Sequence, residues 1–244
     1  MNYNKHITFR MTQNNPTLKR LYALFLLVIV TNFASVFAQN TDSTKISAKW
    51  ETAIATFEKS DLTNPPPKGG FEFIGSSTIV KWKTLKQDFT GYPVFNRGFG
   101  GSRIIDSFNF ASRIILPYMP KKIFFHAGDN DLSSGKSPEQ VFVDFKALVQ
   151  IIHANLPKTE IFFISLKPSE KRRRLHFEEQ KVNNYIQEFT KNNPFVHYID
   201  TYNMALDAEG KPRPELFAVD QLHFNEAGYK LLADKVRPFL EEKY

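Results

Sequence analysis

From residue 71 onward, short apolar runs alternate with longer segments whose apolar residues recur at helical spacing. Short runs rich in β-branched and aromatic residues favour buried strands, and strands that alternate with helices favour a parallel sheet with helices on both faces. The predicted strands are residues 71–74, 93–96, 122–126, 160–165 and 195–199. The predicted helices are 79–85, 104–116, 138–155, 170–192 and 225–242. This pattern predicts an α/β fold, and 244 residues are enough for one large domain.

The first 38 residues have the composition of a secretory signal. They contain no acidic residue, and Lys19 and Arg20 precede an apolar run at 21–30. A small residue, Ala38, stands at the expected cleavage point. We therefore expect a secreted or periplasmic protein, cleaved near Ala38 and without a stable membrane span in its mature form. An uncleaved anchor is the alternative, although the apolar run is short for a membrane span.

Residues 39–67 are expected to form an amphipathic helix and a proline-rich linker in front of the main domain at 68–244. A helical spacing of apolar residues begins near residue 45, and Pro65-Pro66-Pro67 then interrupts regular structure. The apolar residues with this spacing are Ile46, Trp50, Ala53, Ile54 and Phe57. We interpret this helix as structural.

Charge and cysteine content exclude several classes of protein. The formal net charge is +7, but four of the positive residues lie in the predicted signal, which leaves +3 for the rest of the chain. Nucleic-acid binding requires a stronger basic face, so no nucleic-acid partner is expected. The dense run Lys171-Arg172-Arg173-Arg174 is interpreted as a solvated helix start, with an anionic partner as the alternative. The absence of cysteine excludes disulfides and an N-terminal lipidated cysteine.

Three residues could form a nucleophilic site. Ser77 follows the first predicted strand, and Asp220 and His223 lie three residues apart in a predicted loop near the end of the chain. A serine attacks a carbonyl only if a base removes its proton, and an imidazole base works best when a carboxylate orients it. The alternatives are a helix cap at Ser77 and a capping or surface role for His223.

Two further segments follow predicted strands and could supply hydrogen-bond donors. The segment Asn96-Arg97-Gly98-Phe99-Gly100-Gly101-Ser102 could direct a bare backbone NH into the site, or it could be a turn that needs positive φ. In Gly128-Asp129-Asn130-Asp131, the Asn130 amide could donate to a developing oxyanion. An Asx turn is the alternative there. A metal site of His126, Asp129 and Asp131 is less favoured because no dedicated ligand spacing occurs.

The remaining histidines of the main domain are not favoured as bases. His126, His153, His176 and His197 are expected to lack a carboxylate partner at short range. We interpret His153, on a helical pattern, and His197, inside a strand, as structural.

Four ordered blocks of the chain resemble those of the SGNH hydrolases, also called the GDSL-like lipase and acylhydrolase family. These blocks are Gly75-Ser76-Ser77, Asn96 to Gly101, Gly128 to Asp131, and Asp220-Gln221-Leu222-His223. Together they span nearly all of the chain after the proline linker. The resemblance implies a flavodoxin-like three-layer α/β/α fold with a five-stranded parallel sheet. It also implies a serine esterase that requires no cofactor and no metal.

The resemblance further implies a catalytic role for each of five residues. Ser77 would be the nucleophile, and its NH would also serve the oxyanion hole. Gly101 would give the second backbone donor, with Gly100 as the alternative, and Asn130 the side-chain donor. His223 would be the general base and then the general acid, and Asp220 would orient it.

The chain departs from the family pattern at one position. The usual Gly-Asp-Ser is Gly-Ser-Ser here, so Ser76 replaces the acid and two adjacent serines compete for the role of nucleophile. The position in the block favours Ser77. The ordinary α/β-hydrolase is a rival fold, but its nucleophile elbow, Gly-x-Ser-x-Gly, would need a glycine where Ile79 stands.

The sequence favours a secreted esterase whose substrate is a small-molecule or carbohydrate ester with a short acyl group. The reason is that no long apolar insertion could form a lipid-binding lid, and the loops between the blocks are short. Phe95, Phe99, Phe108 and Phe110 are interpreted as core residues, with an acyl tunnel as the alternative. A lysophospholipase or lipase-type acylhydrolase and a noncatalytic glycan-binding module are the alternative functions. The sequence leaves the oligomeric state open.

Overall fold

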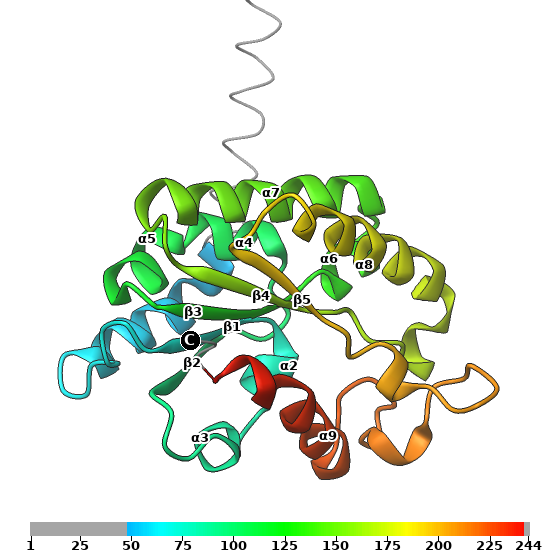
Figure 1. Cartoon of the computed structure of the whole chain (residues 1–244). Helices are drawn as coiled ribbons and strands as arrows, with labels where there is room; N and C mark the ends of the chain where they lie inside the picture. Colours follow the sequence, from blue (N-terminus) through cyan, green and yellow to red (C-terminus); the bar gives the residue numbers. More distant parts are fainter. Residues whose placement is uncertain (1–47, 242–244) are drawn as a thin grey trace, which may run out of the picture. The chain divides into compact units, whose positions relative to one another are not determined.

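The computed structural model describes residues 48–241, and the predicted signal segment lies outside this range. Its centre is a five-stranded parallel sheet, β1 (Phe71–Gly75), β2 (Val94–Gly98), β3 (Lys122–His126), β4 (Glu160–Ile164) and β5 (Val196–Ile199). The strand order is β2-β1-β3-β4-β5 (Figure 1). The predicted α/β fold is confirmed, and all five predicted strands occur within two residues of their expected bounds.

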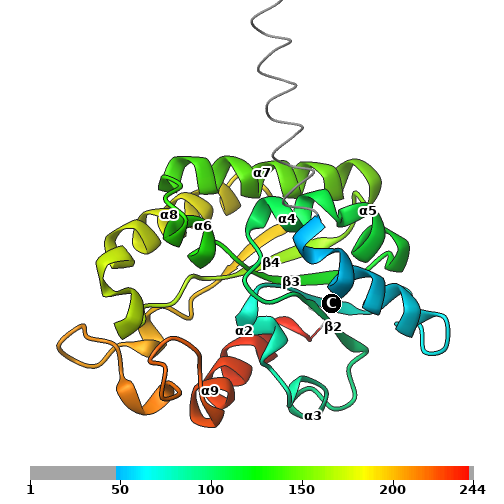
Figure 2. The same cartoon turned by 180° about the vertical axis from the view of Figure 1, so that it is seen from behind.

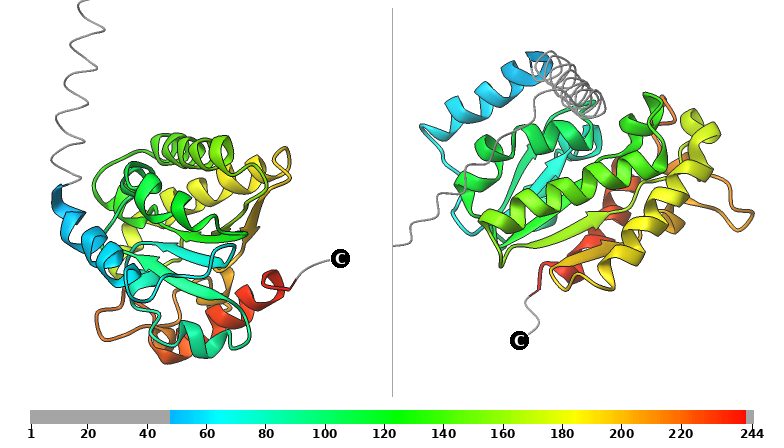
Figure 3. Two further views of the ribbon diagram at one scale, coloured as in Figure 1. Left: turned by 90° about the vertical axis from the view of Figure 1, so that its left-hand side faces the viewer. Right: turned by 90° about the horizontal axis from the view of Figure 1, so that it is seen from above.

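Helices cover both faces of the sheet, as the side-on view in Figure 3 shows. One face packs against a helix at residues 48–61 and against α4 (Ile104–Asn109), α5 (Ala111–Ile114), α7 (Pro138–Asn155) and α8 (His176–Thr190). The other face packs against α2 (Ser77–Val80), α3 (Leu85–Asp88) and α9 (Glu226–Val236). Shorter elements complete the described chain: α6 (Asp129–Ser133) and the 3-10 helices η1 (Leu116–Tyr118), η2 (Glu170–Leu175), η3 (Asn203–Ala205), η4 (Pro214–Leu216) and η5 (Arg237–Phe239).

The alternation of side chains along β1 explains why both faces need a layer of helices. Phe73 contributes to the core under α2, α3 and α9, whereas Ile74 contributes to the core under α4 and α7. Both side chains are fully buried. A parallel strand that is apolar on both faces is stable only when both faces are covered.

Four predicted helices are interrupted. The helix predicted at 225–242 is α-helical only in α9 and continues as η5. The segment predicted as a helix at 79–85 is instead α2 and α3, because Trp82 leaves the helical path to pack between Phe73 and Phe89 and to donate to Asp88 at 2.7 Å. The helix predicted at 104–116 is divided between α4, α5 and η1. The helix predicted at 170–192 begins as η2 and becomes α-helical only at α8.

The helix at residues 48–61 is held against the main fold by ion pairs as well as by apolar contacts. Arg113 bridges Glu51 and Glu58 with N–O distances of 2.8 and 2.6 Å, and Arg97 pairs with Asp61. Figure 2 shows this helix in blue beside α4 and α5. Among residues 48–241, no helix is long and apolar enough to cross a membrane.

Replacement of Gly75 by alanine is expected to destabilise the fold strongly. Gly75 has φ 136°, and a Cβ atom there would lie 2.1 Å from the carbonyl oxygen of His126 on the neighbouring strand. The central sheet would have to separate, so we expect Gly75→Ala to lower the free energy of unfolding by about 3 kcal/mol or more. Urea denaturation measures this change.

Gly91→Ala is the matched control for this prediction. Gly91 also has positive φ, 92°, but no atom lies within 4 Å of the added Cβ. Only backbone strain remains there, which costs about 1–2 kcal/mol. Equal losses for the two variants would show that the contact with His126 has no special importance.

Candidate active site

The strand order places a topological switch point at the carboxyl ends of β1 and β3. From β1 the chain crosses to β2 on one side, and from β2 it returns to β3 on the other side of β1. Loops that leave neighbouring strands in opposite directions open a binding site between them. Ser77 follows β1, Gly100 and Gly101 follow β2, and Asn130 follows β3, so the topology brings all three segments to the same edge of the sheet.

Ser77 is the serine that faces the predicted base. It begins α2 and is partly exposed, and its Oγ lies 3.0 Å from His223 Nε2. Ser76 is buried at 2% exposure, its NH donates to His126 O, and its carbonyl accepts from Ile79 NH. Of the two adjacent serines, only Ser77 therefore presents its hydroxyl to the imidazole.

A tight turn presents Asp220 and His223 together. Asp220 Oδ2 lies 2.6 Å from His223 Nδ1, and Oδ1 accepts from the NH groups of Leu222 and His223, both at 3.0 Å. Gln221 has a positive φ of 51°, which closes the turn. Because a carboxylate at Nδ1 requires a proton there, Nε2 is left as the acceptor for the Ser77 hydroxyl.

The hydrogen bonds around Asp220 also fix its charge. The bond from the His223 side chain and those from the backbone lower the pKa of Asp220 well below its usual range. The side chain of Asp220 is 46% exposed, whereas that of His223 is 16% exposed. Asp220 is therefore an ionised carboxylate at the rim of the site, beside a more sheltered imidazole.

Several donors near Ser77 have no partner. Within residues 48–241, the backbone NH groups of Ser77, Gly100 and Gly101 form no hydrogen bond. Gly101 has a φ of 79°, and the Trp50 ring lies 3.3 Å from the position of a Cβ there. The geometry leaves both glycine NH groups available and does not decide between Gly100 and Gly101.

The Asn130 side chain is fixed at both ends. Its Nδ2 donates to Ser102 O at 3.0 Å, and its Oδ1 accepts from Arg172 Nη2 at 2.7 Å. The amide nitrogen carries two hydrogens, so one of them remains for another acceptor. Asn130 is thus held in place with a donor to spare.

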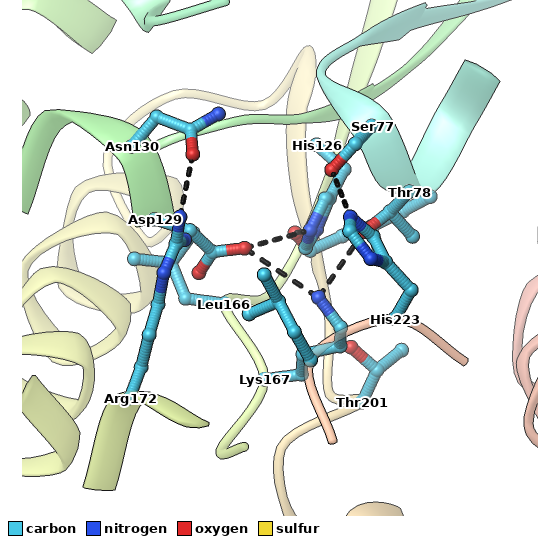
Figure 4. A network of polar contacts seen from close by, with 12 residues as sticks. Ser77, Thr78, His126, Asp129, Asn130, Leu166, Lys167, Arg172, Thr201 and His223 are labelled. Atoms are coloured by element: carbon cyan, nitrogen blue, oxygen red, sulfur yellow. Dashed lines mark hydrogen bonds and ion pairs between the residues drawn. The ribbon is translucent and has the colours of Figure 1, made fainter. Parts of the chain in front are cut away.

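A charged cluster lies behind Ser77 and Asn130 (Figure 4). Asp129 Oδ2 lies 3.3 Å from His126 Nε2 and 3.6 Å from Lys167 Nζ, and Lys167 Nζ donates to Thr78 Oγ1 at 3.2 Å. The expectation that the other histidines lack a nearby carboxylate is therefore wrong for His126, because Asp129 follows it by three residues. It is also wrong for His197, whose Nε2 lies 3.1 Å from Glu160 Oε1. His126, Asp129 and Lys167 are each no more than 5% exposed.

The charges within this cluster are set by competition between burial and neighbouring groups. Burial opposes ionisation of Asp129, but Lys167, His126 and Arg172 outweigh it and lower the pKa of Asp129. Burial and the charge of Asp129 instead raise the pKa of Glu179 on α8 to about 9. At neutral pH, Asp129 is therefore ionised and Glu179 is protonated.

Asp131, the other acid of the third block, makes contacts that hold the fold together. Asp131 is fully buried, and its oxygens accept from Ile104 NH at 3.1 Å and from Lys136 Nζ at 3.0 Å. It therefore lies apart from the contacts that join Asp129 to His126. In the described part of the chain, no group of three or more His, Asp or Glu side chains is arranged to hold a metal ion.

The sequence interpretation missed Lys167 and Arg172. Arg172 was expected to lie on a solvated helix start, but its side chain turns to Asn130. A signal for Lys167 was present, since it follows β4 shortly after the carboxyl end of that strand, where sites of this architecture form. Arg172 had no such signal, because a run of four basic residues is typical of a solvated segment, and its neighbours in the run are indeed exposed.

Comparison with known families gives one clear match. The model of the GDSL-like lipase/acylhydrolase family matches residues 75–231, which include all four blocks. No curated protein sequence matches this chain.

Solved structures share the fold at low sequence identity. A protein from Streptococcus pneumonia, provisionally assigned as a platelet activating factor, is 20% identical, with a TM-score of 0.67 over 82% of this chain and 98% of that one. A GDSL-like lipase from Bacteroides thetaiotaomicron is 18% identical, with a TM-score of 0.65 over 77% of this chain and 96% of that one. A catalytic mutant of the acetylxylan esterase Axe2 from Geobacillus stearothermophilus is 13% identical, with a TM-score of 0.60 over 72% of this chain and 96% of that one.

Proposed function

Because the chain belongs to the GDSL-like lipase/acylhydrolase family, we propose that it hydrolyses carboxylic esters through an acyl-enzyme on Ser77. The observation that carries this proposal is the continuous hydrogen-bonded chain from Ser77 Oγ through His223 to Asp220, with distances of 3.0 and 2.6 Å. A nucleophile, a base and an orienting carboxylate in this order are the parts that acyl transfer requires.

In the first step, Ser77 Oγ attacks the ester carbonyl while His223 Nε2 accepts the hydroxyl proton. The imidazolium that forms is stabilised by the ionised Asp220 at Nδ1. Collapse of the tetrahedral intermediate breaks the ester C–O bond, and His223 gives its proton to the leaving alkoxide. In the second step, a water molecule loses a proton to His223 and attacks the acyl-enzyme carbonyl. Collapse of this intermediate breaks the bond to Ser77 Oγ, which takes the proton back from His223 as the acid leaves.

The negative charge on the carbonyl oxygen requires donors that are in place before the reaction. The unpartnered NH groups of Ser77 and of Gly101 or Gly100, together with the remaining hydrogen of Asn130 Nδ2, are suited to this role. Preorganised donors of this kind often contribute several kcal/mol to transition-state stabilisation. No step of this mechanism needs a cofactor.

We further propose that the substrate carries a short acyl group, such as the acetyl group of a carbohydrate ester, and that the enzyme acts outside the cytoplasm. Phe95, Phe99 and Phe110 are buried in the core, which argues against a long acyl tunnel near the second block. The similarity to an acetylxylan esterase agrees with an acetylated carbohydrate. Export rests on the composition of residues 1–38 alone.

A series of 4-nitrophenyl esters tests the proposed acyl preference. If the substrate carries a short acyl group, we expect kcat/KM for the acetate and butyrate to exceed that for the dodecanoate by about 10-fold or more, since the additional methylene groups would find no complementary site. Release of acetate from acetylated xylan, measured beside deacetylated xylan as the control, extends the test to carbohydrate esters. A preference for the dodecanoate would instead support a lipase or lysophospholipase.

A noncatalytic glycan-binding module is the second function that the sequence left open. The replacement of the usual acid by Ser76 gives this alternative slight support, but Ser76 is buried and makes its hydrogen bonds through the backbone. The intact chain of contacts from Ser77 to Asp220 favours turnover over binding alone.

A further inference from the structure

Arg172 departs from the local helix and reaches the candidate oxyanion hole. Within η2 it alone has a non-helical backbone, with φ −116° and ψ 25°. Its Nη2 lies 2.7 Å from Asn130 Oδ1 (Figure 4). The preceding residue, Lys171, donates its NH to Gln221 O at 3.1 Å, so η2 also contacts the turn that carries Asp220 and His223. The run Lys171-Arg172-Arg173-Arg174 therefore contacts both Asn130 and the turn that carries Asp220 and His223.

The two contacts of the Asn130 amide allow only one orientation. Nδ2 faces the Ser102 carbonyl oxygen, and Oδ1 faces the Arg172 guanidinium. After a flip of the amide, two acceptors would meet at Ser102 and two donors would meet at Arg172. Because a guanidinium has donors but no acceptor, Arg172 can bind only the oxygen of the amide. The contact with Arg172 therefore keeps Nδ2, which has the free hydrogen, directed toward the candidate oxyanion hole.

The contact with Arg172 also changes the strength of the remaining donor. A charged donor on Oδ1 withdraws electron density from the amide, and hydrogen bonds in such a chain strengthen one another. Ionised Asp129, which is adjacent to Asn130 in the chain, supplies a compensating negative charge near the guanidinium.

On the basis of the proposed function, we propose that Arg172 is a positioning residue of the oxyanion hole, which orients and polarises the Asn130 amide without contacting the substrate. The exposed residues Arg173 and Arg174 do not share this role, since Arg173 pairs with Glu170 at 2.8 Å and Arg174 has no contact with the site. The alternative is that the partly exposed Arg172 binds an anionic group of the substrate directly.

A double-mutant cycle between Arg172 and Asn130 separates the two roles. Asn130→Ala is expected to lower kcat for 4-nitrophenyl acetate by about 100-fold or more. Arg172→Ala is expected to lower it by about 10- to 100-fold, as the loss of a charge-assisted hydrogen bond does, with KM changed by less than about threefold. If Arg172 acts through Asn130, Arg172→Ala in the Asn130→Ala background lowers kcat by less than about twofold.

Two further variants control for folding and for charge. Arg172→Gln retains a neutral donor for Asn130 Oδ1 and is expected to recover part of the activity that Arg172→Ala loses. Arg174→Ala removes an exposed arginine of the same run and is expected to keep wild-type kcat. Thermal unfolding of each variant checks the fold. If Arg172→Ala does not fold, the double-mutant cycle is measured with Arg172→Gln in its place.

An equal loss in both backgrounds, or an effect on KM alone, would overturn the positioning role and indicate direct binding of substrate. This outcome is distinct from failure of the proposed function. If Ser77→Ala retained turnover, the acyl-enzyme proposal itself would be wrong, whereas an inactive Ser77→Ala with additive Arg172 and Asn130 effects would reject only the inference about Arg172.

Discussion

Ser77→Ala is expected to lower kcat for 4-nitrophenyl acetate by about 10⁴- to 10⁶-fold, which is the loss that removal of a serine nucleophile causes. The substitution removes one oxygen from a partly exposed side chain whose only hydrogen bond within residues 48–241 is with His223. The NH of residue 77 and the start of α2 are unchanged, so the thermal unfolding midpoint should stay within a few degrees of wild type. Initial rates at saturating ester give the comparison.

Ser76→Ala is the matched control, because it removes the same atom from the adjacent residue. The Ser76 side chain forms no cap bond to α2, and the backbone of this residue makes its hydrogen bonds. We expect Ser76→Ala to keep kcat within about 10-fold of wild type. A large loss in Ser76→Ala with turnover retained in Ser77→Ala would reverse the assignment of the nucleophile.

His223→Ala is expected to cause a loss of similar size. Without the imidazole, no group in the described part of the chain lies within hydrogen-bond distance of Ser77 Oγ to remove its proton. If Ser77 and His223 act as one unit, the rate of the double variant should lie within about threefold of the rate of the slower single variant. Stopped-flow or steady-state rates of the three variants test this, and multiplicative losses in the double variant would show that the two residues act independently.

The pH dependence of the wild-type rate gives a second test of His223. The base must be unprotonated, so kcat/KM should rise with pH and then level off. The pKa of Asp220 is lowered, so this carboxylate remains ionised through the weakly acidic range and does not cause the rise. The rise is therefore expected to come from one group, and a rate that is flat from about pH 5 to 8, with chemistry limiting, would contradict a histidine base.

The strands and the order of the blocks could be predicted because each depends on local sequence. The apolar run of β3 has the predicted bounds, and the turn from Asp220 to His223 needs only residues that are adjacent in the chain. The contact between Ser77 and His223 joins residues 146 positions apart. It could be anticipated only from the base and the carboxylate that a serine nucleophile requires and from the resemblance of the four blocks.

Other features depend on packing that the sequence does not encode locally. The helix predicted at 79–85 has a helical spacing of apolar residues, but burial of Trp82 against Phe73 ends α2 early. Arg172 stands among exposed basic residues, and only its non-helical φ and ψ direct it to Asn130. The choice between Gly100 and Gly101 stays open even with the fold known, because both NH groups are without a partner among the described residues.

Reaction with a fluorophosphonate probe tests the central claim most directly, because the probe bonds covalently to a serine only when a base and an oxyanion hole activate it. We predict one adduct per chain by intact mass, located at Ser77 by peptide mapping. Labelling should persist in Ser76→Ala and be absent in Ser77→Ala. No adduct on the folded wild-type protein, or an adduct that persists in Ser77→Ala, would contradict the assignment of Ser77 as the activated nucleophile.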